Sequence, residues 1–384
     1  MTGLLVQRFR SELIDEWIDG ERKEGRLATG ALLISIDGHL RYSRAFGRHG
    51  GATGAPVTAD SRFWIASMTK PITSFAAMML ASRGLLHLAA PVADFIADFG
   101  SRGVLGSDGV TVRPDRAVTV LDLMRHTAGV TYGKFGDQTI HRLYQAADVV
   151  DYGAPNTVIS ARIARLPLMN HPGAAFEYGM STDLLGTIVE RISGYPLARV
   201  LDDLIFIPLG MRATGFRPSP EQVVQLPGSD VQRALAPPLD RGIVWESGGA
   251  GLFSTASDYM KFALMMLGKG ALGNERLLAA SVFSRMLLPQ LPANVTFGAY
   301  THSLGPAAPW PRNGLSFGLG LAVRTRPEPT LPGGIGEFFW PGASGANFWC
   351  DPAASMAVVF LNHDSEDRVR HRINLRRAVY AAIR

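Results

Sequence analysis

The chain contains 384 residues, of which 47% are hydrophobic and 18% are charged, and its formal net charge is +5. This composition indicates a globular chain with a sizeable core and excludes extensive disorder. No uninterrupted apolar run reaches membrane-spanning length and no His-Glu-x-x-His spacing occurs, so we expect neither a membrane protein nor a metal site. The basic residues are scattered except near the C-terminus, so we expect no nucleic-acid partner.

The first predicted element is an amphipathic helix. Apolar residues recur at helical spacing from Val6 to Trp17, and no apolar leader with a small-residue cleavage site precedes them. The single cysteine, Cys350, excludes an internal disulfide and is expected to be a buried, inert thiol in a strand. These features predict a cytoplasmic protein.

Strand patterns occur near both ends of the chain. Residues 30–36 and 40–46 flank an Asp37-Gly38 turn, which predicts a β-hairpin. From about residue 71 to residue 288 the apolar spacing is mostly helical. Strand patterns return at residues 318–325, 337–341, 346–350 and 355–361.

This order of elements predicts an α+β fold, in which one antiparallel sheet is built from both termini and flanked by helices. We expect residues 1–62 and 290–384 to form a discontinuous α/β domain and residues 63–289 to form a mostly helical domain. The last predicted helix is rich in arginine, and we expect those arginines to form a solvated face.

Ser67 and Lys70 give the first indication of chemistry. They lie three residues apart just before a run of helix-forming residues, and positions i and i+3 share one face of a helix. The Lys70 amine can therefore reach the Ser67 oxygen, at a helix start where backbone N–H groups favour a developing anion. Pro71 fits this assignment because proline is tolerated in the first turn of a helix. The pair alone is weak evidence, since two common residues at a fixed gap occur by chance in long chains.

Two later segments supply groups that suit a reactive cleft. Tyr178 lies at the start of a predicted helix, and the pKa of a phenol close to a lysine can fall far enough for the phenol to relay a proton. The segment from Trp340 to Gly345 runs from a strand into a glycine-rich turn, which can offer a backbone N–H to an oxyanion. Pro341 cannot donate a hydrogen bond, so we expect it in an edge strand or at a strand end.

Taken in this order, the three motifs resemble the serine β-lactamase and penicillin-binding protein superfamily. Segments 121–130, 208–211 and 248–259 resemble its class C-like branch, and the similarity extends over about residues 8 to 362. The resemblance implies an α/β sandwich with a mostly helical insert, an active site in the cleft between them, and no cofactor.

Two departures from the β-lactamase pattern favour esters over penicillins. Where the superfamily has Tyr-x-Asn, this chain has Met180 two residues after Tyr178, so the amide is missing. Where the superfamily has Lys-Thr-Gly, this chain has Trp340-Pro341-Gly342, and an indole cannot hold a penicillin carboxylate. Both changes resemble the family VIII carboxylesterases, and no Gly-x-Ser-x-Gly segment indicates an ordinary α/β-hydrolase.

The resemblance also implies a role for each residue. Ser67 would be the acylated nucleophile, and Lys70 and Tyr178 would share its proton. The backbone N–H groups of Ser67 and Ala343 would form the oxyanion hole. The substrate-binding residues implied in this way are Trp340, Gly342, Tyr132 and Met180.

Other polar residues have structural alternatives. His126 is expected to shape a loop, and Asp183 is expected to be a helix cap or to make a core hydrogen bond. Nothing places His302 near a substrate, and Tyr132 could equally be a packing residue.

We therefore expect a serine carboxylesterase acting on a small-molecule ester with a short acyl chain. The sequence leaves open a β-lactamase or D-aminopeptidase-like amidase, an acyltransferase that uses the same acyl-enzyme, and a non-catalytic scaffold. The intact Ser67, Lys70 and Tyr178 argue against the scaffold. The sequence does not indicate the oligomeric state.

Overall fold

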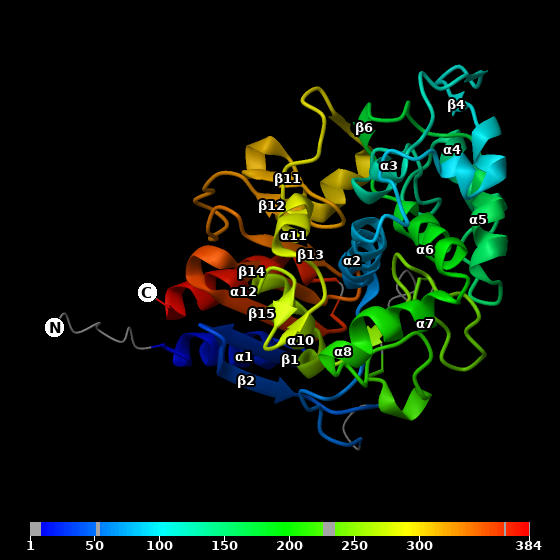
Figure 1. Ribbon diagram of the computed structural model, residues 1–384. Coiled ribbons are helices and arrows are strands. Elements are labelled where there is room, and N and C mark those ends of the chain that lie inside the picture. The colour runs from blue at the N-terminus through cyan, green and yellow to red at the C-terminus, as the bar shows by residue number, and fades with distance from the viewer. Residues whose placement is uncertain (1–8, 51–53, 226–234, 365, 384) are drawn as a thin grey trace.

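A seven-stranded antiparallel sheet forms the centre of the protein. The computed structural model describes residues 9–50, 54–225, 235–364 and 366–383, so Val6 of the predicted first helix lies outside the described residues. The strands follow the order β11-β12-β13-β14-β15-β1-β2, which brings the two ends of the chain together (Figure 1). The strands of the sheet are β1 (Gly30–Ile36), β2 (His39–Phe46), β11 (Leu315–Phe317), β12 (Ala322–Arg324), β13 (Phe338–Pro341), β14 (Asn347–Asp351) and β15 (Met356–Asn362).

The predicted hairpin is confirmed, and its turn explains why it forms. Asp37 and Gly38 have φ angles of 52° and 75°, so both occupy the left-handed region that a two-residue hairpin turn requires. On its other edge β1 pairs with β15, from Gly30 opposite Asn362 to Ile36 opposite Met356. This pairing confirms that one sheet is built from both termini.

The late strands agree with the sequence patterns, except for the first of them, at residues 318–325. Pro341 is the last residue of β13, where its missing N–H is tolerated, as predicted. Cys350 lies buried in β14, also as predicted. The predicted strand at residues 318–325 is too long, because only its end forms β12 and a turn with Gly320 at φ 89° precedes it. Strand β11, on the other side of this turn, was not predicted.

Helices cover the sheet and form a second region beside it. Helices α1 and α12 pack on each other, and Trp17 of α1 meets Phe360 of β15 edge-on at 6.0 Å between ring centroids. Helix α10 packs on β14, β15 and β1. The longer helices are α1 (Glu12–Lys23), α2 (Thr69–Ser82), α4 (Thr139–Ala146), α5 (Asn156–Ala164), α6 (Ser181–Ser193), α10 (Ala256–Leu267), α11 (Ala280–Met286) and α12 (Arg368–Ala382). The short helices are α3 (Val120–Met124), α7 (Leu197–Leu201) and α8 (Ile207–Leu209).

Helix α2 connects the sheet to the helical region. Every residue of α2 from Thr69 to Leu80 is buried, and the helix contacts α6, α7 and α11. Figure 1 shows α4, α5 and α6 on the side of α2 away from α1 and α12. The predicted domain boundaries stay a prediction, and α10, which they assign to the helical part, lies against the sheet.

Short strand pairs outside the main sheet brace the loops. Their strands are β3 (Phe63–Trp64) with β7 (Phe253–Ser254), β4 (Val104–Leu105) with β5 (Thr111–Val112), β6 (Ala175–Phe176) with β10 (Thr296–Phe297), and β8 (Ala271–Leu272) with β9 (Glu275–Arg276). The pair β3–β7 holds the segment that leads to Ser67.

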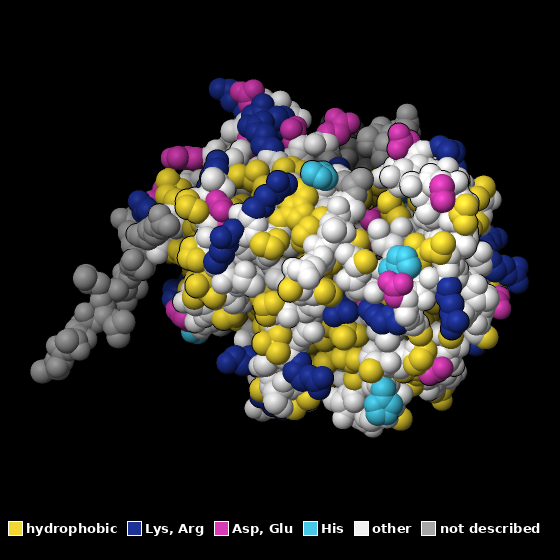
Figure 2. Space-filling model, turned by 90° about the horizontal axis from the view of Figure 1, so that it is seen from above, with side chains coloured by type: hydrophobic (Ala, Val, Ile, Leu, Met, Phe, Trp, Pro, Cys, Tyr) yellow, Lys and Arg dark blue, Asp and Glu magenta, His cyan; other side chains and the backbone are white. Residues whose placement is uncertain are grey.

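The molecular surface carries mixed charge. On the face shown in Figure 2, Lys and Arg side chains are interspersed with Asp and Glu side chains instead of forming one basic patch. Within the described residues, no helix combines the length and the apolar character needed to cross a bilayer.

The arginines of α12 differ from the expected solvated face. Arg376 is buried, and its guanidinium is bonded to Glu337, which also accepts from Arg324 Nε of β12 at 3.0 Å. Arg372 points inward too and donates to the carbonyl of Gly342. The prediction was wrong for these two residues because their partners are remote in sequence.

The Glu337 carboxylate should be a major contributor to stability. Replacing Glu337 with Gln should lower the free energy of unfolding by about 3–5 kcal/mol, because two guanidinium groups would then be buried without a carboxylate. Urea denaturation followed by far-ultraviolet circular dichroism measures this change. Asp203→Asn, which weakens the exposed pair with Arg199, is the control and should leave the midpoint unchanged. A loss below about 1 kcal/mol for Glu337→Gln would contradict the prediction.

Candidate active site

Ser67 lies in a tight turn between β3 and α2. The turn is a short 3-10 helix, Ala66–Met68, and Ser67 is 8% exposed. Ala66 has a φ angle of 46°, in the left-handed region that residues other than glycine rarely adopt. Such strained residues cluster at functional sites. Pro71 is the third residue of α2, as expected for a proline near a helix start.

Lys70 is fully buried and makes three polar contacts through its amine. Nζ lies 3.4 Å from Ser67 Oγ, 2.9 Å from the Tyr132 hydroxyl and 2.8 Å from the carbonyl oxygen of Gly249. Burial lowers the pKa of Lys70 to about 8, and the nearby Asp183 carboxylate partly opposes this shift. A substantial fraction of the amine is therefore neutral near pH 8.

Tyr178 also lies beside Ser67. Its hydroxyl accepts a hydrogen bond from Trp340 Nε1 at 3.0 Å, and Ser67 lies close enough to lower its pKa. The Lys70 amine lies 4.8 Å from the centre of the Tyr178 ring. Burial raises the pKa of Tyr178, although Ser67, the indole N–H of Trp340 and the charge of Arg372 oppose this shift. The expected lowering of the pKa is therefore wrong, because burial outweighs these groups.

The structure also brings Tyr132 to the site, because Tyr132 binds the Lys70 amine directly. Burial raises the pKa of Tyr132 well above its ordinary value, so its hydroxyl stays protonated. It packs edge-on against Tyr178, with ring centroids 5.7 Å apart. Tyr132 thus orients the amine between the two phenols.

The glycine-rich turn after β13 lies against the segment that precedes Ser67. A Cβ on Gly342 would lie 2.4 Å from the carbonyl oxygen of Ile65, so only glycine fits. The next residue, Ala343, lines the same cavity as Ser67. The two backbone N–H groups assigned to the oxyanion hole thus belong to adjoining segments.

The cavity at Ser67 is small, largely apolar and rich in aromatic side chains, with a volume of about 50 Å³. Met180 lines it as predicted, whereas Trp340 and Gly342 do not. Trp340 lies behind Tyr178 and acts on it through the indole N–H. The lining residues are Trp64, Ala66, Ser67, Tyr132, Phe135, Val150, Tyr152, Tyr178, Met180, Asp183, Leu235, Trp245, Ser247, Ala250, Tyr300 and Ala343.

Several of these residues were not singled out by the sequence. Tyr300 stacks on Tyr178 with ring centroids 5.6 Å apart and an interplanar angle of 9°. Trp245 packs on Tyr152 in the opposite wall. No local motif marks these aromatic residues, since they are contributed by segments far apart in the chain.

Asp183 makes core hydrogen bonds, which is one of the two roles predicted for it. Its Oδ1 accepts from Ser247 Oγ at 2.5 Å and from the backbone N–H of Gly249 at 3.0 Å. The carbonyl of Gly249 in turn binds Lys70. Asp183 therefore positions a backbone acceptor for the amine and adds a negative charge near it.

The two histidines considered in the sequence do not act on Ser67. His126 has a φ angle of 57° and packs its buried ring on Tyr178, with ring centroids 4.8 Å apart. Burial lowers the pKa of His126 well below its ordinary value, so the ring is neutral. His302 packs on Trp310 and does not line the cavity. Both observations agree with structural roles.

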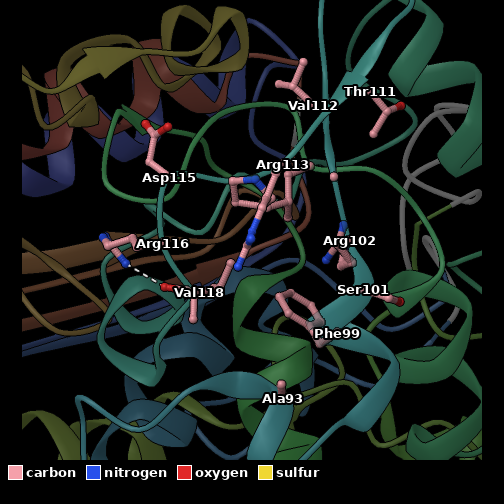
Figure 3. Close-up of a pocket in the computed structure, with 15 residues that line it drawn as sticks. Ala93, Phe99, Ser101, Arg102, Thr111, Val112, Arg113, Asp115, Arg116 and Val118 are labelled. Carbon is pink, nitrogen blue, oxygen red and sulfur yellow. Dashed lines mark hydrogen bonds between the residues drawn. The ribbon is translucent and has the colours of Figure 1, made fainter.

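A larger cavity lies elsewhere, between the β4–β5 ribbon and the loop before α3 (Figure 3), and has a volume of about 740 Å³. It is lined by Arg102, Arg113 and Arg116, of which Arg116 pairs with Asp122. Arg102 is buried and binds the Tyr144 hydroxyl at 2.9 Å. Ser67 lines the smaller cavity and not this one. Among the described residues, no group of His, Cys, Asp and Glu side chains is arranged to hold a metal ion.

Comparisons with known proteins identify the family of this chain. Protein Rv1367c of Mycobacterium tuberculosis is 35% identical over 324 residues, which cover 80% of this chain and 79% of that protein. Esterase EstB of Burkholderia gladioli is 29% identical over 398 residues, which cover 96% and 94%. The solved structure of EstCE1, a hydrolase with promiscuous acyltransferase activity, has a TM-score of 0.79 at 24% identity and covers 96% of this chain and 98% of its own. The family model described as Beta-lactamase matches residues 14–382, and the chain therefore belongs to the beta-lactamase family.

Proposed function

We propose that this protein is a serine carboxylesterase that hydrolyses short-chain carboxylic esters through an acyl-enzyme on Ser67. The observation that carries the proposal is the meeting of Ser67 Oγ, Lys70 Nζ and the Tyr178 hydroxyl beside one small, largely apolar cavity. The similarity to Esterase EstB, a relative named as an esterase, supports the same class of reaction.

Lys70 is the group that accepts the serine proton. With its pKa lowered to about 8, its amine is partly neutral at mildly alkaline pH, whereas Tyr178, whose pKa is raised, stays protonated. Ser67 Oγ bonds to the ester carbonyl carbon, and the N–H groups of Ser67 and Ala343 hold the oxyanion. The carbon–alkoxide bond then breaks, and Lys70 and Tyr178 together pass the proton to the leaving alcohol.

The second half of the reaction uses the same groups. A water molecule loses a proton to the Lys70–Tyr178 pair and attacks the acyl carbonyl carbon of the acyl-enzyme. The bond to Ser67 Oγ breaks, Ser67 regains the proton, and the carboxylic acid leaves. Trp340 keeps the Tyr178 hydroxyl aimed at Ser67 throughout.

The size and polarity of the cavity define the substrate class. A volume of about 50 Å³ is several times the roughly 10–15 Å³ that one enclosed water molecule needs. A short, uncharged acyl group fits this space and the aromatic walls. Trp340 and Met180 stand where the superfamily has a lysine and an asparagine, so groups that would hold a penicillin are missing.

Acylation of Ser67 tests the proposal directly. After brief exposure to p-nitrophenyl butyrate, the wild-type protein should gain the mass of one butyryl group and release p-nitrophenol. Ser67→Ala should do neither, because the nucleophile is absent. Intact-protein mass spectrometry and absorbance measure the two quantities.

The matched control is Ser82→Ala at the end of α2, where the hydroxyl binds only a backbone carbonyl in its own helix. This variant should be acylated like the wild type. If Ser67→Ala and the wild type behave alike, the esterase proposal is wrong. Retention of a fluorescent penicillin on Ser67 without ester turnover would instead favour a penicillin-recognising enzyme.

The pH profile should report the ionisation of Lys70. Because the neutral amine accepts the proton, kcat/KM should rise with pH through about 8 and then level off. Asp183→Asn removes the carboxylate that opposes the lowering of the Lys70 pKa, so the midpoint should move to lower pH. Initial rates across a pH series measure both midpoints. The exposed Asp203→Asn is the control, and a midpoint that moves to higher pH in Asp183→Asn would contradict this role for the carboxylate.

An acyltransferase is the second candidate, and the cavity favours it specifically. The largely apolar walls disfavour water beside an acyl group, so an added alcohol can compete as the acceptor. In the presence of a small alcohol, we expect transfer to form a new ester at the expense of the free acid. Gas chromatography of both products measures this partition. Free acid as the only product at every alcohol concentration would exclude transfer.

A further inference from the structure

We infer that Arg372 is a positioning residue that strengthens the oxyanion hole by binding the peptide unit whose N–H, at Ala343, faces the reacting carbonyl. The inference deepens the proposed function and rests on it. It assigns a purpose to an inward-facing arginine on the last helix, which no sequence motif marks.

The contact involves a single peptide unit. Arg372 Nη2 donates a hydrogen bond to the carbonyl oxygen of Gly342, and that carbonyl shares its peptide bond with the N–H of Ala343. The backbone N–H of Gly345 donates to the same oxygen at 3.2 Å. A donor on the carbonyl side of a peptide withdraws electron density, and the N–H on the other side becomes a stronger donor.

The charge on Arg372 is what makes this effect substantial. Its neighbours on α12 have carboxylate partners: Arg370 pairs with Glu21 and Arg376 with Glu337. Among the described residues, no carboxylate forms a salt bridge with Arg372, so its charge reaches the turn without local neutralisation. The Arg372 guanidinium is part-buried, and burial lowers its pKa to about 9, so it is still mostly a cation near pH 8. A cation that is partly withdrawn from water polarises a peptide more strongly than one in open solvent.

The backbone geometry transmits the effect to the reacting atoms. Gly342 lies so close to the carbonyl of Ile65 that no side chain fits, and Ile65 precedes the Ala66–Ser67 turn. The polarised N–H of Ala343 is therefore held at a fixed place relative to Ser67. Arg372 also lies close enough to Tyr178 and Tyr300 to interact with both electrostatically, which places its charge beside the same cavity.

The alternative is that Arg372 only stabilises the conformation of the turn. Three substitutions distinguish this structural role from polarisation of the peptide. Arg372→Lys keeps the charge, Arg372→Gln keeps a neutral N–H donor, and Arg372→Met keeps only the apolar stem. Removing an oxyanion-hole donor typically lowers kcat about 10²- to 10³-fold, and polarisation is a fraction of that effect. We expect Arg372→Met and Arg372→Gln to lower kcat for p-nitrophenyl butyrate about ten- to thirtyfold with little change in KM, and Arg372→Lys to recover most of the loss.

Butylboronic acid provides a readout that does not need turnover. Its tetrahedral adduct with Ser67 carries an oxygen where the oxyanion forms, so its inhibition constant should rise in parallel with the fall in kcat. Arg370→Met is the matched control, because it removes an arginine from the same helix without touching the turn. Thermal melting of every variant identifies any that do not fold, and the Lys and Gln variants still decide the question if the Met variant fails.

The outcomes distinguish this inference from the proposed function. If wild type is acylated on Ser67 but Arg372→Gln matches it in kcat and in boronate affinity, the charge has no role and the inference is wrong. A loss in all three variants, with Lys no better than Met, would show a purely structural fastening and would also overturn it. If the wild type is neither acylated nor inhibited by the boronate, the proposed function fails, and the inference fails with it.

Discussion

The buried amine of Lys70 is the interaction on which the site depends. It makes contacts with three neutral oxygens and with no carboxylate, although Asp183 lies near enough to act through space. A cation in this position is costly, so the neutral amine is favoured and a base becomes available near pH 8. The helix α2, buried on nearly all sides, keeps water away and thereby maintains this state.

The groups around the Lys70 amine accommodate both its charged and its neutral form. Asp183 fixes Gly249 through a backbone N–H, and the carbonyl of Gly249 accepts a hydrogen bond from the amine in either protonation state. The phenols stay protonated because burial raises the pKa of each. One group is thus free to titrate while its neighbours stay fixed, which lets the site take up and return a proton without rearranging.

Much of the architecture follows from local sequence signals. The Asp37-Gly38 turn determines the first hairpin, and the i, i+3 spacing of Ser67 and Lys70 brings a hydroxyl and an amine together on the helix that follows. Tyr178 and Trp340 could be assigned only through resemblance to a family, yet their side chains meet at 3.0 Å. The domain boundaries and the roles of the site residues remain predictions.

The parts that could not be predicted depend on contacts between distant segments. An arginine in a charged helix gives no sign that it will bind Gly342 rather than water, and the inward direction of Arg372 is visible only in three dimensions. Tyr300 lies in a 3-10 helix, Ala299–Ala307, and Trp245 lies in a loop. Neither segment has a periodic apolar pattern, and only the folded chain brings the two residues to the cavity. The missed β11 has the same cause, because three residues are too few to produce an alternation.

The pairing of Gly30 with Asn362 has a consequence for how the protein forms during synthesis. The β1–β2 hairpin emerges from the ribosome long before β15, the strand that pairs with its second edge. Until then, β1 presents unpaired backbone groups that other chains can bind. Contacts this remote in sequence also make folding slow, so the nascent chain passes through a long interval in which protection by chaperones matters most.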